Sequence, residues 1–363
     1  GAKTSTFYEK DVAASTTATG RSMIIYAKKI IEEVYGDRIY ETKEDGVVRT
    51  KAEYVYGDTD SVFFTFNLED PKTKKPIRGQ KALALTIEIA QDAAHLCSQY
   101  LKPPMDLEYE KTLMPFILLS KKRYVGMLYE DDPNKGSLKY MGLVLKRRDN
   151  CDLVKDVYGG VLDILMKDSN IDNSIKFLNN YLEDLIQGKI HMDKLAITKA
   201  LRGYYKNPKQ IAHNVLANRM GKRDPGNKPS VGSRVPFVYI QTKGKVKLQG
   251  DKIEDPTYIK EKSLKPDYKF YITNQIMKPL LQLFGLVLEQ MPEFKGKLRE
   301  FKRKIRSLER QHKSGDFSYE KLQEKITKLR NKNVKELIFD PSLNKQKSQA
   351  MKKAMRDFFK PKK

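Results

Sequence analysis

A six-residue segment, Tyr56-Gly57-Asp58-Thr59-Asp60-Ser61, constrains the fold of this chain more than any other feature. Aromatic and β-branched residues flank it on both sides, in 53–55 and 62–66. Two such runs around a short Gly/Asp turn predict a β-hairpin. Residues two apart on a strand face the same side, so we expect the carboxylates of Asp58 and Asp60 to point at one spot.

Two carboxylates on one face of a hairpin are typical of a site for hard divalent cations. Mg²⁺ prefers oxygen ligands, and phosphoryl transfer with two metals about 3.5–4 Å apart needs a carboxylate cluster. A lone Asp-x-Asp also occurs in ordinary surface turns. The strand-type residues on both sides favour the metal-binding interpretation here.

The charge of the chain favours a polyanionic partner, because the net charge is +24. Of this, +15 falls in 295–363, with 23 basic and 8 acidic residues.

Cys97 and Cys151 stand in unrelated contexts and the 4 histidines are scattered, so neither zinc nor an iron–sulfur cluster is expected. No apolar run approaches the length of a membrane span. An intracellular, reducing compartment is expected.

The periodicity of the first 150 residues predicts an α+β domain. Apolar stripes predict helices over 13–35 and 80–100. Cys97 falls on the apolar face of the second helix, so we expect a small core residue there. Together with further strand patterns, these helices predict an antiparallel sheet with helices packed on one face. The strand patterns cover 107–111, 116–119, 124–129 and 139–145.

Helical patterns dominate after residue 150. Two apolar stripes in 296–333, separated by Ser314-Gly315-Asp316, predict an antiparallel helical hairpin with basic outer faces. His213 is a lone histidine in a helical stretch, and we interpret it as structural rather than as a metal ligand. An extended interlude is expected at 234–248. The other helices are expected at 151–166, 173–187, 208–220 and 272–291.

Two polar clusters accompany the aspartate hairpin. Lys121-Lys122-Arg123-Tyr124 lies between two strand patterns and, taken alone, also fits a solvated charge run. Glu108 and Glu110 alternate along 107–111. This alternation by itself fits an exposed strand face.

The hexapeptide and the Lys-Lys-Arg-Tyr cluster together resemble family B DNA polymerases. With the helical hairpin at 296–333 and without cysteine clusters, the chain looks most like those of large nucleocytoplasmic DNA viruses. The resemblance implies an α+β palm subdomain followed by a mostly α-helical thumb, as parts of an incomplete right-hand polymerase. It implies that Asp58 and Asp60 are catalytic and hold two Mg²⁺ ions. By the same resemblance, Asp60 is the main ligand and Glu110 is a third acidic residue near the metals.

The resemblance also implies the substrates, which are primer–template DNA and deoxynucleoside triphosphates. Cations on the phosphate backbone position DNA without reading its sequence. The residues implied to contact DNA are Lys121, Lys122, Arg123, Tyr124, Arg147, Arg148 and Arg234.

The expected domains follow the same resemblance. Residues 1–150 form the carboxy-terminal part of the palm, and 151–294 form the thumb. A basic helical hairpin extends the chain over 295–345. The last segment, 346–363, is a basic tail.

The tail resembles a sliding-clamp peptide. Met355, Phe358 and Phe359 have the required spacing, since one helical turn puts all three on one side. The chain departs from the pattern at Lys352, where clamp peptides usually carry Gln. A short amphipathic helix docked on the chain itself is the alternative.

Parts of a family B polymerase do not occur in the sequence. They are the segment with a further metal-binding Asp, the fingers helix that grips the triphosphate, and the proofreading exonuclease. We therefore expect the carboxy-terminal part of a split or truncated polymerase, inactive without an amino-terminal half. Its expected place is viral DNA replication, in the host cytoplasm or nucleus. The alternatives are a non-catalytic DNA-binding or clamp-tethering module, and a general polyanion binder driven by the basic 295–363 segment.

Overall fold

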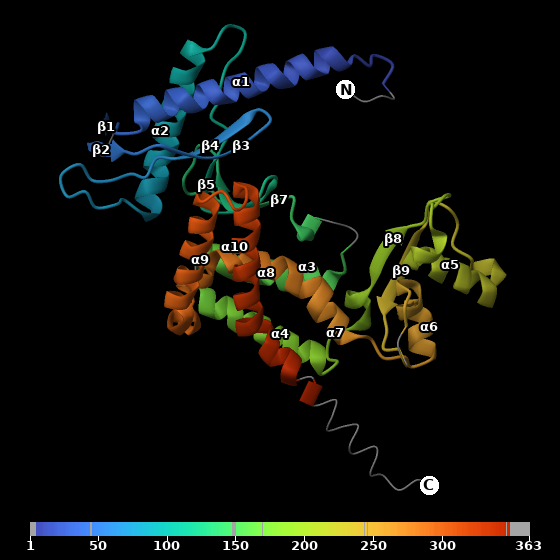
Figure 1. Ribbon diagram of the computed structural model, residues 1–363. Coiled ribbons are helices and arrows are strands. Elements are labelled where there is room, and N and C mark those ends of the chain that lie inside the picture. Colours follow the sequence, from blue (N-terminus) through green and yellow to red (C-terminus); the bar gives the residue numbers. More distant parts are fainter. Residues whose placement is uncertain are drawn as a thin grey trace. The chain divides into compact units, whose positions relative to one another are not determined.

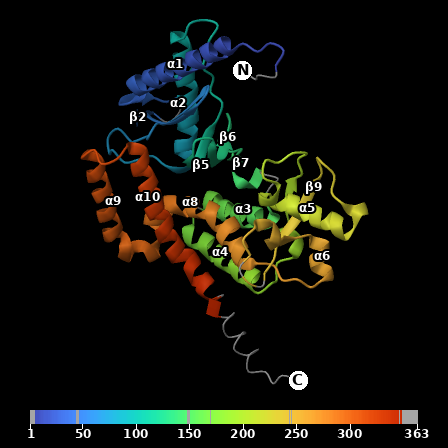
Figure 2. The same cartoon turned by 45° about the vertical axis from the view of Figure 1, so that its right-hand side comes forward.

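The computed structural model of the chain describes residues 5–43, 46–146, 150–168, 170–242, 244, 246–345 and 347–348. The chain divides into two compact units, Gly1–Met141 and Gly142–Lys363, and each is described by itself (Figure 1 and Figure 2). Their assignment as palm and thumb stays a prediction. Five predicted site residues lie outside the described residues: Arg147, Arg148, Met355, Phe358 and Phe359.

The two helices predicted for the first unit are confirmed as α1 (Lys10–Tyr35) and α2 (Gly79–Tyr100). The buried residues of α1 all lie in its second half, whereas α2 buries residues along most of its length. Cys97 of α2 is 0% exposed and belongs to the core cluster, which confirms its interpretation as a core residue. Aromatic rings complete this core, with Tyr35 and Phe66 packed edge to face at 5.8 Å.

The strands of the first unit form three small antiparallel sheets rather than the single sheet that the sequence predicted. Two sheets are hairpins, and the third has the order β5-β6-β7. The aspartate hairpin is a sheet of its own. The strands are β1 (Arg38–Glu41), β2 (Val47–Thr50), β3 (Glu53–Asp58), β4 (Ser61–Thr65), β5 (Thr112–Ser120), β6 (Arg123–Tyr129) and β7 (Ser137–Met141).

The strand predicted over 107–111 is wrong, and the side chain of Ser98 explains why. Its Oγ donates to the carbonyl of Leu107 at 3.0 Å and accepts from the N–H of Leu107 at 2.9 Å. Both backbone groups of Leu107 are therefore bonded to α2 instead of a neighbouring strand. The ladder begins only at Thr112, where β5 pairs with β6.

The second unit is mainly helical, as predicted, with a three-stranded antiparallel sheet of order β10-β9-β8. The expected helix over 208–220 begins only at Ala212, because 208–210 form a short 3₁₀ turn. Its helices up to residue 287 are α3 (Asp152–Lys167), α4 (Ile171–Ile186), α5 (Ala212–Arg223), α6 (Pro256–Glu261), α7 (Tyr268–Phe270) and α8 (Met277–Val287). Its strands are β8 (Ile197–Ala200), β9 (Arg234–Tyr239) and β10 (Ile253–Glu254).

A buried carboxylate ties β10 to α5. Glu254 is only 2% exposed. It accepts from Arg223 Nη2 at 2.7 Å and from Arg219 Nη1 at 3.1 Å. Burial alone would raise the pKa of Glu254, but the hydrogen bond from Arg223 and the neighbouring charges outweigh it and hold the pKa below its usual range.

Tyr271 joins three segments of the second unit that are far apart in the sequence. Its fully buried hydroxyl donates to the carbonyl of Leu195 at 2.8 Å and accepts from the N–H of Tyr239 at 3.0 Å. It opens a π-helical turn, Tyr271–Ile276, that leads into α8.

His213 is buried in the same unit. Its Nε2 lies 3.0 Å from Tyr205 Oη, and burial lowers the pKa of His213.

The predicted helical hairpin is confirmed as α9 (Leu298–Lys313) and α10 (Tyr319–Val334), which lie side by side in Figure 1. Phe301 of α9 and Ile326 of α10 are buried as their stripes required. Tyr319 departs from its predicted stripe, because 62% of it is exposed.

Across the described part of the chain, every helix is too short or too polar to cross a lipid bilayer.

Candidate active site

Both aspartates lie at the tip of the β3–β4 hairpin. β3 ends at Asp58, which pairs with Ser61 at the start of β4. Thr59 has a φ of 56°, a left-handed conformation that is costly for a β-branched residue. The carbonyl of Asp58 accepts from the N–H of Asp60 at 2.6 Å and from Ser61 Oγ at 3.1 Å. These bonds close the turn and hold its two carboxylate-bearing residues in place.

Glycine residues permit this close packing. A Cβ atom at position 57 would lie 2.5 Å from Tyr54 Oη and 3.1 Å from the carbonyl oxygen of Ser61. A Cβ atom at Gly20 of α1 would lie 3.4 Å from the carbonyl oxygen of Thr59. The backbone of α1 therefore passes close to the aspartate turn.

A second tight turn, between β5 and β6, reaches the aspartate hairpin. It consists of Lys121 and Lys122, and Lys122 has a φ of 61°. The N–H of Lys122 donates to Tyr56 Oη at 2.8 Å, and its Nζ lies 2.7 Å from Asp58 Oδ1. The structure thus brings a predicted DNA contact and a predicted metal ligand into one ion pair.

Aromatic rings from β3, β4, β5 and β6 pack together next to both turns. Phe63 of β4 stacks on Phe116 of β5 at 5.9 Å, and Tyr124 packs edge to face on Phe63 at 5.6 Å. Tyr56 lies 5.7 Å from the same Phe63 ring. Tyr124 is only 9% exposed, so little of its surface is open to a ligand. Its contact with DNA stays a prediction, and in the structure its ring packs on Phe63 and Phe116.

The ion pair changes the acidity of both of its members. The hydrogen bond from Lys122 holds the pKa of the Asp58 carboxyl below its usual range, and the hydroxyl of Thr59, which donates to Asp58 Oδ1 at 3.1 Å, adds to this effect. The same bond raises the pKa of the Lys122 ammonium. Asp58 is therefore ionised throughout the neutral range, with one oxygen engaged by a cation.

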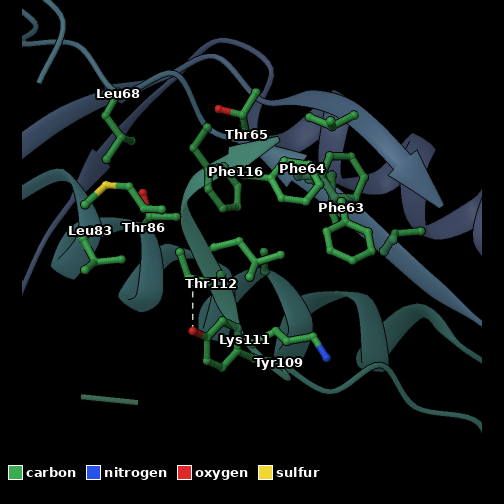
Figure 3. Close-up of a pocket in the computed structure, with 18 of the residues that line it drawn as sticks. Phe63, Phe64, Thr65, Leu68, Leu83, Thr86, Tyr109, Lys111, Thr112 and Phe116 are labelled. Atoms are coloured by element: carbon green, nitrogen blue, oxygen red, sulfur yellow. Dashed lines mark hydrogen bonds between the residues drawn. The ribbon is translucent and has the colours of Figure 1, made fainter. Parts of the chain in front are cut away.

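A cavity of about 1260 Å³ opens beside the hairpin, within the first unit. Figure 3 shows Phe63, Phe64 and Phe116 on one side of it and Leu83 of α2 on another. Asp60 lies on its lining, as does Glu110, and the structure thereby brings these two carboxylates to one cavity.

The position of Glu110 differs from the one predicted. It precedes β5 and does not lie on a strand. Its side chain is 73% exposed and pairs with Lys111. Its role as a third acidic residue near the metals stays a prediction.

A magnesium site at the aspartate turn stays a prediction. Asp58 and Asp60 supply carboxylate oxygens, the donors that Mg²⁺ prefers. Among the residues that the structure describes, no cluster of three or more His, Cys, Asp or Glu could hold a metal ion. The donor chemistry therefore fits Mg²⁺, whereas the number of carboxylates falls short of a two-metal cluster.

The remaining predicted DNA contacts lie at different places in the two units. Lys121 is exposed at the tip of the β5–β6 turn, and Arg123 begins β6. Arg234 begins β9 in the second unit, where its Nη2 donates to the carbonyl of Thr198 at 2.9 Å and to its hydroxyl at 2.8 Å. All three remain predicted contacts.

The sequence reasoning missed Tyr56, whose hydroxyl joins the two turns. A signal was present, because Tyr56 and Asp58 are two apart and share one face of β3. A phenolic oxygen on the same strand face as a candidate metal ligand suggests a hydrogen-bonding role. The pairing of Asp58 with Lys122 had no such local signal.

Comparisons with known proteins show which family the chain belongs to. Residues 1–287 match the sequence model of DNA polymerase family B. The DNA polymerase of Pyramimonas orientalis virus is 47% identical over 355 residues, covering 94% of this chain and 27% of that protein. The DNA polymerase of Acanthamoeba polyphaga mimivirus is 44% identical over 261 residues, covering 70% of this chain and 15% of that protein.

A cellular relative is less similar. The DNA polymerase delta catalytic subunit of Candida albicans is 36% identical over 277 residues, covering 76% of this chain and 25% of that protein. This chain spans at most 27% of the length of these three relatives. The resemblance to viral polymerases is confirmed, and the chain belongs to DNA polymerase family B.

Proposed function

We propose that this chain acts in template-directed DNA synthesis, as the carboxy-terminal palm and thumb part of a family B DNA-directed DNA polymerase. The observation that carries the proposal is the meeting of the aspartate turn with the Lys121–Lys122 turn. It sets residues suited to metal ions beside residues suited to phosphates, as nucleotidyl transfer at a primer end requires. The viral relatives support a role in viral DNA replication within the host cell.

In the proposed reaction the 3′-hydroxyl of the primer attacks the α-phosphate of a deoxynucleoside triphosphate, and pyrophosphate leaves. Asp60, supported by Asp58, would hold Mg²⁺, which when bound promotes deprotonation of the hydroxyl and offsets charge on the phosphates. Lys121 and Lys122 would hold the primer backbone. Asp60 is the more available carboxylate, because Lys122 engages Asp58.

We propose further that synthesis needs a third carboxylate, supplied by an amino-terminal half of the polymerase. Two aspartates alone carry too little negative charge to hold two divalent ions. The cavity beside Asp60 offers room for an added segment. On this proposal the chain is inactive alone, and Glu110 on the same cavity is the alternative third ligand.

A non-catalytic DNA-binding or clamp-tethering module is the second candidate. The observation that favours it is the pairing of Asp58 with Lys122, which reduces the negative charge available at the turn. The clamp peptide at Met355, Phe358 and Phe359 lies outside the described residues and stays a prediction.

Primer extension with Mg²⁺ separates these functions. The chain is tested alone and together with an amino-terminal half of a family B viral polymerase. We expect synthesis only from the pair, and Asp60→Asn should lower its rate about a thousandfold, equivalent to roughly 4 kcal/mol in the barrier. Duplex binding by this variant should be retained.

A matched control is Asp172→Asn, which removes an exposed carboxylate of α4 in the second unit. It should leave synthesis unchanged. Full activity of Asp60→Asn in the pair would refute the catalytic role of this residue. Extension by the chain alone would refute the need for a second part and would point to Glu110.

A further inference from the structure

Five basic residues follow one side of α9 in the helical hairpin. Successive members are four, three, four and three residues apart, the spacing of neighbours on one helix face. All five are exposed. We call them the α9 stripe, and they are Arg299, Arg303, Arg306, Arg310 and Lys313.

The α9 stripe faces away from the side of α9 that packs against protein. Phe301 of α9 is buried, and its ring packs edge to face on Phe294 at 5.3 Å. Ile305 and Leu308 are partly buried on the same side of the helix. At 3.6 residues per turn, these positions lie well over 90° around the helix from the centre of the stripe. The stripe is therefore not needed for the core of the hairpin.

The α9 stripe also differs in its electrostatic environment from several other cations of the hairpin. Lys304 pairs with Glu300, and Lys328 pairs with Glu324. By contrast, the side chains of the stripe form no ion pair or hydrogen bond with any residue that the structure describes. α9 carries two acidic residues, Glu300 and Glu309. Glu300 pairs with Lys304, whereas Glu309 borders the stripe and forms no ion pair or hydrogen bond with any described residue. Five cations in a row, bordered by only two carboxylates on α9, keep an excess of positive charge that is suited to a polyanion.

We propose that the α9 stripe binds the phosphate backbone of duplex DNA. Lys313 lies 14 residues after Arg299, so the stripe is about 21 Å long at about 1.5 Å per residue. That length matches the rise of about six phosphates along one strand. Arginine can also form paired hydrogen bonds to a phosphate.

The proposal rests on DNA being the partner in the proposed function, and it adds a contact to that function. The hairpin lies beyond residues 1–287, which match the family as a whole. A backbone contact here would hold the duplex without reading its sequence. It would therefore increase affinity for any duplex that the polymerase copies.

The test measures binding of the full chain to a labelled duplex by fluorescence anisotropy at increasing KCl. One variant changes all five stripe residues to Gln. A control variant changes five other exposed lysines of the same region to Gln, so both lose equal charge. The control lysines all have ion-pair partners, and they are Lys297, Lys302, Lys304, Lys328 and Lys332.

The slope of log affinity against log salt reports the number of phosphate contacts, at about 0.9 per contact. We expect the stripe variant to lose about 4.5 from the slope if all five residues touch phosphates. Its loss of affinity between 50 and 200 mM KCl would then be about 500-fold smaller than that of the unaltered chain. The control variant should lose much less.

An unchanged slope in the stripe variant would overturn the inference and leave the proposed polymerase function standing. Equal losses in both variants would also overturn it, because net charge rather than the stripe would then decide binding. If the unaltered chain did not bind the duplex, both this inference and the proposed DNA partner would fail. Circular dichroism of both variants checks that the helices persist.

Discussion

Replacing Gly57 with alanine should destabilise the aspartate hairpin, and removing one oxygen atom from Tyr54 should repair most of the damage. A Cβ atom at position 57 would lie 2.5 Å from Tyr54 Oη, well inside van der Waals contact. The carbonyl oxygen of Ser61 would be 3.1 Å away, a tighter contact than usual. Overpacking of this kind costs about 1–3 kcal/mol.

The variant Tyr54→Phe removes the atom that makes the closest contact. The next atom of the ring, Cζ, would be 3.4 Å from the new Cβ, which is an ordinary contact. The ring keeps its edge-to-face packing on Phe64 at 5.8 Å. Alone, this variant should therefore change stability by less than about 0.5 kcal/mol. Combined with Gly57→Ala, it should recover about 1 kcal/mol or more, a coupling that independent sites do not show.

Hydrogen exchange of the β3 and β4 amides is the appropriate assay, because a chain of two units need not unfold in one step. A change of about 1.4 kcal/mol in opening free energy corresponds to a tenfold change in exchange rate. Gly57→Ala should also slow primer extension by the assembled polymerase, and adding Tyr54→Phe should restore most of the rate, because this hairpin carries Asp58 and Asp60. Equal exchange rates in Gly57→Ala and the double variant would refute the argument that the Tyr54 hydroxyl makes glycine necessary.

Three further variants test the surroundings of the site. Lys122→Gln should raise the pKa of Asp58 towards its ordinary value of 3.8, measured by NMR titration, because the hydrogen bond that lowers it is lost. Thr59→Gly should slow exchange in the hairpin by roughly fivefold, since relief of a left-handed β-branched residue is worth about 1 kcal/mol. Glu254→Gln should lower the unfolding free energy of the second unit by about 3 kcal/mol in urea, because two arginines lose their buried partner.

Each variant has a control and a contrary outcome. The folded pKa of Glu254 is depressed, so its stabilisation is present above the ordinary value of 4.5 and is lost as pH falls through the lower folded value. The decrease in unfolding free energy caused by Glu254→Gln should therefore become smaller at acidic pH. A decrease that does not depend on pH would contradict the role of the Glu254 carboxylate. For Asp58 the control is Lys121→Gln, which should leave the pKa unchanged. Faster exchange in Thr59→Gly would show that the hydroxyl of Thr59 matters more than its strain.

The local elements were predictable, and the contacts between them were not. The aspartate hairpin, α1 and α2 follow from residue alternation and periodicity within single segments. The pairing of Lys122 with Asp58 depends on how two hairpins approach each other, which no short window contains. The strand expected over 107–111 failed because the hydroxyl of Ser98, on α2, bonds both backbone groups of Leu107.

The sequence therefore indicated the chemistry of the site but not the spatial arrangement of its residues. Residue types and spacing were enough to identify Asp58 and Asp60 as candidate ligands. The aromatic support of Phe63, Phe116 and Tyr124 was hidden, because each ring by itself looks like an ordinary strand residue. Packing of this kind appears only when strands from separate sheets meet.

The buried hydroxyl of Tyr271 has a consequence for how the second unit opens. Leu195 and Tyr239 each share one of its hydrogen bonds. Opening either segment alone would leave a buried polar group without a partner, at a cost of about 1–3 kcal/mol. The small sheet and the helix that follows it should therefore lose protection together, as one cooperative unit, rather than fray strand by strand.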